Sequence, residues 1–278
     1  MNKKRKLLVT SLIIIITIVC IFLGNKTRYN NRMIITQLNG EGDGYILKTS
    51  ESNLIIIDGG TKNDVERIKQ IINESEHKRV LAWFITSPEE DKAGALCEIL
   101  NTESDVPIDQ IYFSFIDYGE WYQNSKAESD EINNIIDNLN IFFSDKNRGK
   151  LIELGRRTMY KFDNLYITAL EVKNEQEFDN TDIANQNVIL RVDNTFKSAV
   201  FLGDIGEEKG DYFMKNDQDQ FDCNLLQISS DNLGNAGNEI FKAIEPEYVL
   251  ISDDTIPNFV ESENVYTKQA KEKTLEIW

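Results

Sequence analysis

The chain has 278 residues, of which 41% are hydrophobic and 10% aromatic, so it can bury a sizeable core and is not expected to be disordered. Its formal net charge of −17 repels phosphate backbones, which makes nucleic acid an unlikely partner. Three cysteines are too few for a disulfide framework, and Cys20 lies in an apolar run. We expect Cys97 and Cys223 to be buried free thiols, with a bridge between them as the alternative.

The N-terminus carries an apolar segment with a strong charge bias. Leu7 to Gly24 is a run of residues without a charge, at the lower limit of length for crossing a bilayer. The sequence MNKKRK precedes it, so we expect the N-terminus in the cytoplasm and the rest of the chain outside. No small-x-small pattern follows the run, which favours an uncleaved signal anchor over a cleaved signal peptide. The sequence thus predicts a single-pass protein of the cell membrane.

The predicted anchor divides the chain into three regions. We assign residues 1–24 to the anchor and transmembrane helix, 25–32 to a short polar linker, and 33–278 to one domain. No internal repeat and no Pro- or Gly-rich linker divides the last region.

The turn NGEGDG, Asn39 to Gly44, precedes a strand and not a helix, so it is not a phosphate-binding loop.

The domain alternates strands and helices along the chain. Apolar patterning predicts strands over 33–38, 45–49, 53–58, 79–86, 110–115, 150–154, 158–162, 165–170, 187–192, 197–203, 224–229 and 247–252. Helical spacing predicts helices over 64–74, 92–100, 130–143 and 237–244. Residues 264–268 and 274–278 are interpreted as a terminal hairpin. This order predicts an α/β sandwich of two sheets with helices on the outer faces.

Three further features carry little chemistry. The aromatic cluster YGEWYQ, Tyr118 to Gln123, is interpreted as a loop that either packs into the core or lines a cleft. Ser229 and Ser230 have no nearby base, so a serine hydrolase is not favoured. His77, the only histidine of the chain, lies in a polar stretch and is expected at the surface.

Four landmarks occur in order along the chain: GEGDGYILKTSESNLIIIDGG, ITSPEEDKAGAL, NVILRV with SAVFLGDIG, and NLLQISSDN with FKAIEPEYVLIS. Together they resemble the metallo-β-lactamase fold, an αββα four-layer sandwich. Within that fold the chain resembles the secreted or membrane-attached branch related to the C-terminal domain of the competence protein ComEC. The resemblance covers almost the whole region from Met33 to Trp278.

The family's metal loop, T-H-x-H-x-D-H-x-G-G-L, is altered here. Laid on Thr86 to Leu96 without gaps, the histidine positions become Ser87, Glu89 and Lys92, and the aspartate remains as Asp91. Asp204 stands where the family has a bridging carboxylate, and Ser230 and Asp231 replace a histidine motif. Imidazole is the usual zinc ligand in such loops, so the resemblance implies that a zinc site built from histidines has been lost.

The remaining groups leave two interpretations open. Lys92 can pair with Asp91 or Asp204, which gives an emptied site held by an internal salt bridge, with no metal. Alternatively Glu89, Asp91, Asp204 and Asp231 form an all-oxygen site, which suits Ca²⁺, Mg²⁺ or Mn²⁺ better than Zn²⁺. Asp43 and Asp58 are further cleft candidates. We expect a structural role for Asp58: its carboxylate hydrogen-bonds loop backbone, and Gly59 and Gly60 allow the turn.

The function that we favour is a membrane-anchored, extracytoplasmic protein of this fold that binds or scaffolds an unidentified protein or small molecule without catalysis. The runner-up is a hydrolase with a carboxylate-bound metal, for which the resemblance implies phosphodiester substrates. A third hypothesis is a sensing domain that reuses the old active cleft. An open cleft lined by Tyr and Trp would favour sensing, and a filled cleft would favour scaffolding.

Overall fold

A computed structural model gives the structure of the chain. It describes residues 13–20, 24, 32–102, 106–114, 118–125, 127–172, 183–229, 234–252, 255–258, 260, 264–267 and 273–277. Ser230 and Asp231 of the predicted site lie outside these ranges, as does most of the predicted anchor and linker. Residues 13–20 are helical, and within the described ranges no helix is both long and apolar enough to cross a bilayer.

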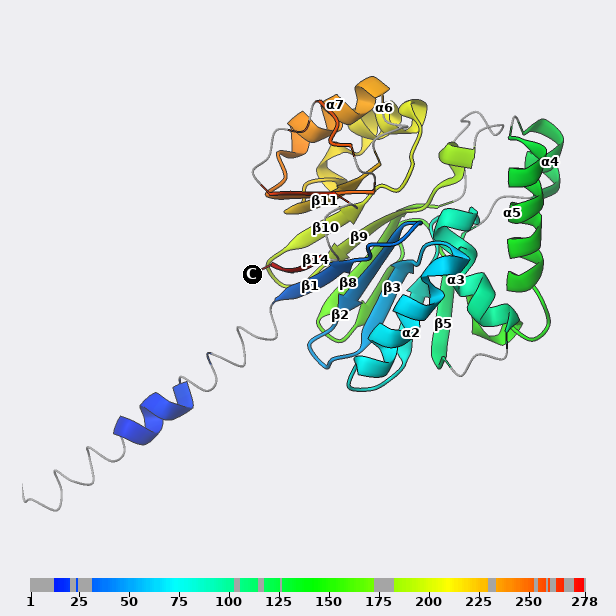
Figure 1. Cartoon of the computed structure of the whole chain (residues 1–278). Helices are drawn as coiled ribbons and strands as arrows, with labels where there is room; N and C mark the ends of the chain where they lie inside the picture. Colours follow the sequence, from blue (N-terminus) through cyan, green and yellow to red (C-terminus); the bar gives the residue numbers. More distant parts are fainter. Residues whose placement is uncertain are drawn as a thin grey trace, which may run out of the picture.

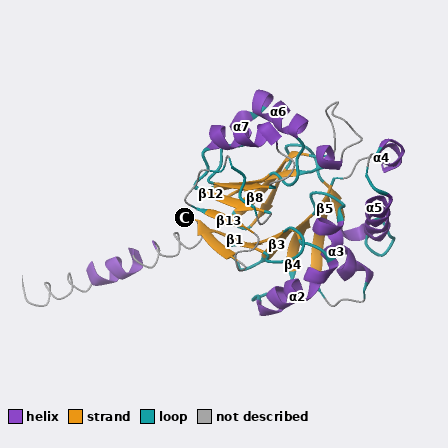
Figure 2. Cartoon of the chain, turned by 45° about the horizontal axis from the view of Figure 1, so that its top comes forward, coloured by secondary structure: helices purple, strands orange, loops and turns teal. Residues whose placement is uncertain are grey.

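The described strands form two mixed seven-stranded sheets that face each other (Figure 2). The first sheet has the order β14 (Lys273–Ile277), β1 (Met33–Gln37), β2 (Gly44–Lys48), β3 (Leu54–Asp58), β4 (Val80–Phe84), β5 (Ile108–Phe113), β6 (Leu151–Glu153). The second has the order β13 (Val265–Thr267), β12 (Tyr248–Ile251), β11 (Leu225–Ile228), β10 (Ser198–Phe201), β9 (Ile189–Asp193), β8 (Leu165–Glu171), β7 (Met159–Phe162).

Helices cover the outer face of each sheet (Figure 1). The helices α2 (Val65–Glu74), α3 (Glu90–Asn101) and α5 (Ser129–Phe142) lie over the first sheet, and α6 (Glu207–Asn216) and α7 (Gly234–Ile244) lie over the second. The short helix α4 (Tyr118–Asn124) precedes α5, and 3₁₀ turns occur at η1 (Lys62–Asp64), η2 (Arg148–Lys150), η3 (Ile183–Gln186) and η4 (Gln218–Gln220). The predicted αββα layering is present in the described residues.

Three apolar clusters hold these layers together. One lies between the sheets and includes Tyr45, Phe84 and Phe201, and the other two lie under the helices of each sheet. Strands with both faces covered are nearly continuous runs of buried apolar residues, such as Leu54 to Ile57 in β3. This double burial explains why LIIID is uniformly apolar where a half-exposed strand would alternate.

Two sequence-based predictions about chain segments were wrong. The last two strands do not form a hairpin, because β13 pairs with β12 and β14 pairs with β1. Each strand completes the edge of a different sheet, where Leu275 and Ile277 become buried. The aromatic cluster is the helix α4 and not a loop; Trp121 is buried and Tyr122 is exposed, so one ring packs into the core and the other does not.

Smaller differences concern helix ends and cysteines. Helix α3 starts at Glu90, two residues before its predicted start, and α6 had no predicted counterpart. Cys97 and Cys223 are buried free thiols, and they lie in the apolar layers on opposite sides of the sandwich. The thiol prediction is therefore confirmed and the alternative bridge is wrong.

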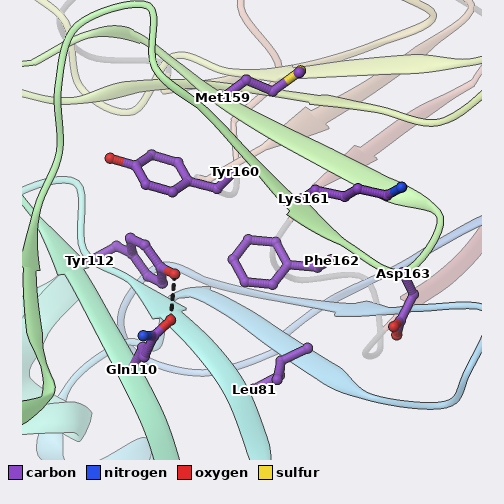
Figure 3. A pocket seen from close by; sticks show the side chains of 8 residues that line it. All are labelled: Leu81, Gln110, Tyr112, Met159, Tyr160, Lys161, Phe162 and Asp163. Atoms are coloured by element: carbon purple, nitrogen blue, oxygen red, sulfur yellow. Dashed lines mark hydrogen bonds between the residues drawn. The ribbon is translucent and has the colours of Figure 1, made fainter.

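A pocket of about 490 Å³ opens between the sheets near β5 and β7 (Figure 3). Its lining is mainly aromatic and aliphatic: Leu81, Gln110, Tyr112, Met159, Tyr160, Lys161, Phe162 and Asp163. The rings of Tyr112 and Tyr160 meet edge to face with centroids 4.9 Å apart. None of these residues belongs to the predicted metal loop.

Candidate functional site

The altered metal loop connects β4 to α3 and directs its charged side chains to one side. Glu89 is the N-cap residue of α3, and its carbonyl accepts from the backbone N–H of Lys92 and Ala93 at 3.2 and 2.8 Å. Residues three apart share a helix face, so this first turn places Lys92 beside Glu89. The acidic residues of the turn also suit the positive end of the helix dipole.

Lys92 is the centre of the site, with a side chain that is 1% exposed. Its ammonium donates to Asp91 Oδ2 at 3.0 Å and to Asp204 Oδ2, and lies 3.9 Å from Glu89 Oε2. Burial by itself lowers the pKa of the Lys92 amine, but Glu89, Asp204 and Asp91 together raise that pKa well above its usual value. The predicted pairing of Lys92 with Asp91 and Asp204 is confirmed.

Asp204 reaches this cluster from the second sheet. It follows β10 and Gly203, which has φ +60°, a conformation that glycine adopts without strain. The backbone N–H of Gly203 donates to Gln227 Oε1 at 2.9 Å, and Asn187 Nδ2 donates to the carbonyl of Asp204 at 3.1 Å. These buried contacts fix Asp204, so the Lys92–Asp204 pair joins the two halves of the sandwich.

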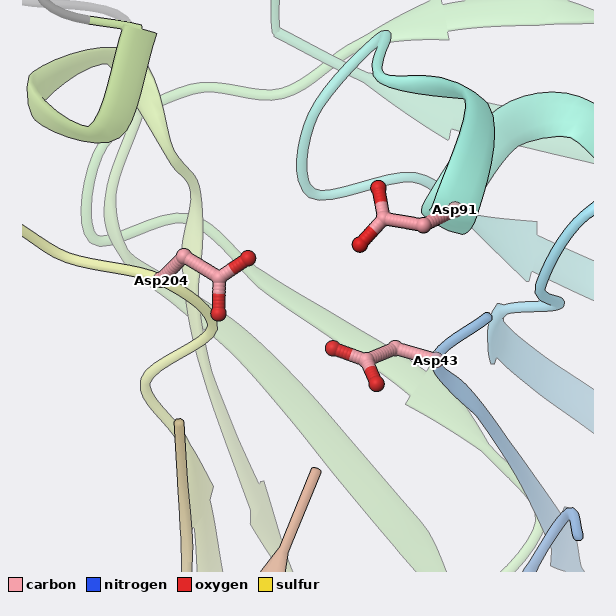
Figure 4. A group of neighbouring side chains, drawn as sticks. All are labelled: Asp43, Asp91 and Asp204. Atoms are coloured by element: carbon pink, nitrogen blue, oxygen red, sulfur yellow. The ribbon is translucent and has the colours of Figure 1, made fainter. Parts of the chain in front are cut away.

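Asp43 is the third carboxylate of the cluster. Figure 4 shows Asp43, Asp91 and Asp204 pointing toward one another, and one oxygen from each lies within 4.8 Å of the others. The backbone N–H of Asp43 donates to the carbonyl of Asp91 at 2.7 Å, which fixes the turn Asn39 to Asp43 against α3. From the sequence, Asp43 was named as a cleft candidate but was not included among the metal ligands.

Glu89 and Ser87 are bonded to each other. Ser87 Oγ donates to Glu89 Oε2 at 2.6 Å, and Ser87 is buried. Two of the family's histidine positions are thus occupied by a hydroxyl–carboxylate pair. Burial raises the pKa of the Glu89 carboxyl, although Lys92 opposes the rise.

Asp58 has a structural place beside the cluster. Its carboxylate accepts from the Thr86 backbone N–H at 2.8 Å and from Thr86 Oγ1 at 2.9 Å, and its own carbonyl accepts from the Trp83 indole. It has φ +58° and is buried. Burial raises its pKa to about 7 against the lowering effect of the Thr86 hydrogen bonds. The prediction that Asp58 hydrogen-bonds loop backbone is confirmed, and the backbone is that of Thr86 at the start of the altered metal loop.

These residues do not fit a zinc ion held by histidines. Every histidine position of the loop that the structure describes carries a hydroxyl, a carboxylate or an ammonium. The three aspartates are close enough to share a hard cation, but the Lys92 ammonium already binds two of them. The site can therefore hold positive charge in only one of two forms, the internal ammonium or a cation that displaces it.

Gly42 is required for the close approach of the turn to α3. A Cβ at this position would lie 2.1 Å from the Asp91 carbonyl oxygen and 2.5 Å from Gly60 Cα. Gly42→Ala is expected to lower the free energy of unfolding by about 2 to 4 kcal/mol, because backbone atoms must move apart. Gly149→Ala is the matched control, since nothing lies within 4 Å of its Cβ. Urea unfolding of both variants measures the difference, and equal losses would contradict the close contact.

Comparisons with known proteins bear on the fold. No protein-family model and no curated protein matches the sequence. Among solved structures, the metallo-β-lactamase fold protein YhfI from Bacillus subtilis matches 87% of this chain and 99% of its own, with 13% identity and a TM-score of 0.50. Zn²⁺-bound PqqB from Methylobacterium extorquens matches 74% and 76%, with 11% identity and a TM-score of 0.44. With the two facing sheets and their outer helices, the match to YhfI shows that the chain has the metallo-β-lactamase fold.

Proposed function

We propose that the protein is a non-catalytic binding or scaffolding protein of this fold, in which the Lys92 ammonium takes the place of a metal ion. The observation that carries the proposal is the contact of the buried Lys92 side chain with part-buried carboxylates from two distant segments. Three carboxylates this close repel one another unless a cation lies among them. The ammonium supplies that charge from within the chain and keeps the loops together.

The same geometry argues against chemistry by Lys92 itself. A lysine acts as a nucleophile or base only in its neutral form, and the surrounding carboxylates raise the pKa of this amine. An ammonium also has no coordination position for a water molecule, so it cannot make hydroxide available as a bound metal does. The site therefore lacks the activation step on which hydrolysis by this fold depends.

The second candidate is a hydrolase with a hard cation bound by Asp43, Asp91 and Asp204, acting on phosphodiesters. One observation favours it: these three carboxylates have oxygens within 4.8 Å of one another. It requires Lys92 to leave its place between Asp91 and Asp204. The sensing hypothesis is weakened at the cluster, because Ser87 and Lys92 are each 1% exposed.

The proposal includes membrane attachment and the ComEC-like branch. Ile13, Ile15 and Ile18 on the described helical stretch are 57%, 57% and 59% exposed, which is costly in water and suited to lipid. The charge bias of MNKKRK supports an extracytoplasmic domain. The sequence landmarks quoted for the ComEC-like branch support the alignment of Thr86 to Leu96 with the metal loop of that branch. The binding partner is an unidentified protein or small molecule.

Restoring the imidazoles tests the proposal. We expect the purified full chain to bind no stoichiometric Zn²⁺, Mn²⁺ or Ca²⁺ by elemental analysis. The triple variant Ser87→His, Glu89→His, Lys92→His is expected to bind zinc and gain about 2.7 kcal/mol of unfolding free energy at zinc one hundred times above its Kd. Adding Asp204→Asn to the triple variant is the control and is expected to weaken zinc binding.

Two results would count against the proposal. Stoichiometric metal in the natural chain, together with turnover of a generic phosphodiester, would establish the second candidate. A triple variant that folds but has no affinity for zinc would contradict the loop register.

A further inference from the structure

The end of the sandwich where the chain enters the domain is built from turns of both sheets. Ile34 pairs with Lys48, and Lys48 pairs with Leu54, so the β2–β3 turn lies beside the start of β1. Asn164 Nδ2 donates to the carbonyl of Arg32 at 3.4 Å, which places the β7–β8 turn there as well. We call this the entry end, and it comprises Arg32 and the turns 49–53, 163–164 and 194–197.

The β9–β10 turn belongs to the same end by strand register. Tyr166, next to the β7–β8 turn, pairs with Asp193, and Asp193 pairs with Ser198. The carboxylate–lysine cluster lies at the opposite end, since Asp43 and Asp58 stand where β2 begins and β3 finishes. A five-residue strand of about 17 Å separates the two ends.

Phe196 projects from the β9–β10 turn and is 66% exposed, the highest value among the described large apolar side chains. The turn that carries it is closed by hydrogen bonds. Asn194 Oδ1 accepts from the backbone N–H of Phe196 at 2.9 Å and of Lys197 at 2.8 Å. The Asn194 backbone N–H donates to the Lys197 carbonyl at 2.9 Å. The backbone therefore holds the ring outward in a fixed turn.

Four acidic groups near this end are paired, and Glu51 of the turn 49–53 is exposed, in a chain with a net charge of −17. Glu276 pairs with Arg32 at 3.0 Å, Asp109 with Arg79 at 3.1 Å, and Glu247 with Lys197 at 2.8 Å. Asp163 accepts from Asn53 Nδ2 at 2.9 Å and from Thr49 Oγ1. Paired charges reduce the repulsion that an acidic protein meets at an anionic lipid surface.

The chain length limits the distance between this end and the predicted anchor. Residues 25–32 lie between the apolar run and β1, and eight residues span at most about 28 Å when fully extended. An exposed Phe at this end of the domain can bury its ring at the headgroup–acyl boundary, as the apolar residues of interfacial segments do.

We propose that the entry end rests on the outer surface of the bilayer that anchors the chain, with the Phe196 ring in the headgroup region and the carboxylate–lysine cluster facing away. The inference rests on the anchoring in the proposed function. It assigns the carboxylate–lysine cluster to the side that is open to extracytoplasmic partners and assigns the lipid surface to Phe196.

Fluorescence quenching by brominated lipids tests the contact. The full chain carrying Phe196→Trp is reconstituted in phosphatidylcholine nanodiscs with or without bromine on the upper acyl chain, and the natural chain in the same discs supplies the background. The added tryptophan is expected to lose about half of its emission, as a side chain buried at the headgroup–acyl boundary should. Tyr122→Trp is the control, because Tyr122 is 53% exposed on α4, after the end of β5, and should not be quenched.

The outcomes separate the orientation from the anchor. Retention of the chain in the discs with equal quenching at both positions would overturn the orientation and leave the anchor intact. Release of the chain from the discs in salt would overturn both. A concentration-dependent blue shift without lipid quenching would assign Phe196 to contact between two copies and would also overturn the orientation. The free energy of unfolding of Phe196→Ser should lie within about 0.5 kcal/mol of that of the natural chain, which checks that the turn does not need the ring.

Discussion

Lys92→Met is expected to lower the free energy of unfolding by about 3 kcal/mol at neutral pH in metal-free buffer, because it leaves buried or half-buried carboxylates without their cation. Asp43, Asp91 and Asp204 then repel one another at the distances that the natural chain tolerates only through the ammonium. Methionine is similar to lysine in length and fills the same space, so the loss reports charge and not a cavity.

The same variant is expected to gain a dependence on divalent cations that we do not expect in the natural chain. Removing the ammonium opens an all-oxygen site, and such sites bind Ca²⁺ or Mn²⁺. Ligand at one hundred times its Kd would return about 2.7 kcal/mol. Urea unfolding with and without each metal measures the rescue, and isothermal calorimetry gives its stoichiometry.

Lys69→Met is the matched control for this experiment. Lys69 pairs with Glu66 at 3.3 Å on the exposed face of α2, and such surface pairs contribute about 0 to 1 kcal/mol. A loss in Lys92→Met no larger than in this control would show that the cluster does not need its cation. A large loss without metal rescue would show that the three carboxylates do not converge as Figure 4 indicates.

Asp58→Asn is expected to change the pH dependence of stability. The folded-state pKa of Asp58 is raised to about 7 from 3.8, so the folded chain binds this proton more tightly than the unfolded chain. The favourable contribution is therefore full below about pH 4 and is lost as the pH rises to about 7. The natural chain should lose about 2 to 3 kcal/mol from this group between pH 5 and pH 8, and the variant should not.

Asparagine is suited to this comparison because it tolerates φ +58° and keeps an acceptor for Thr86. Asp58→Ala loses the acceptor and strains the backbone, so it should lower stability by about 3 kcal/mol at pH 5, and by less at pH 8, where the natural chain has lost its own contribution from Asp58. Asp109→Asn, on the exposed pair with Arg79, should change stability by less than about 1 kcal/mol. Equal pH dependence in Asp58→Asn and the natural chain would show that Asp58 titrates as an exposed carboxyl.

Much of the fold could be predicted from local sequence patterns. Runs such as LIIID and VLAWF have the length and apolarity of buried strands, and helical spacing located α2 and α5 within one or two residues. The partners of the last two strands were not encoded in this way. Their patterns fit any open edge, and the choice of β12 and β1 depends on which apolar faces remain uncovered after the rest of the chain has folded.

The candidate site shows the same division between what local sequence predicts and what the tertiary structure decides. The sequence by itself determined that the loop 86–96 has no imidazole and that its one basic side chain, Lys92, follows Asp91 directly. Only the tertiary structure decided that Lys92 meets Asp204, 112 residues away, that Asp43 completes the cluster, and that Asp58 is buried enough to titrate near neutral pH. The physical reason is range: helical and strand spacing act over a few residues, whereas charge pairing and desolvation depend on which distant segments the two packed sheets bring together.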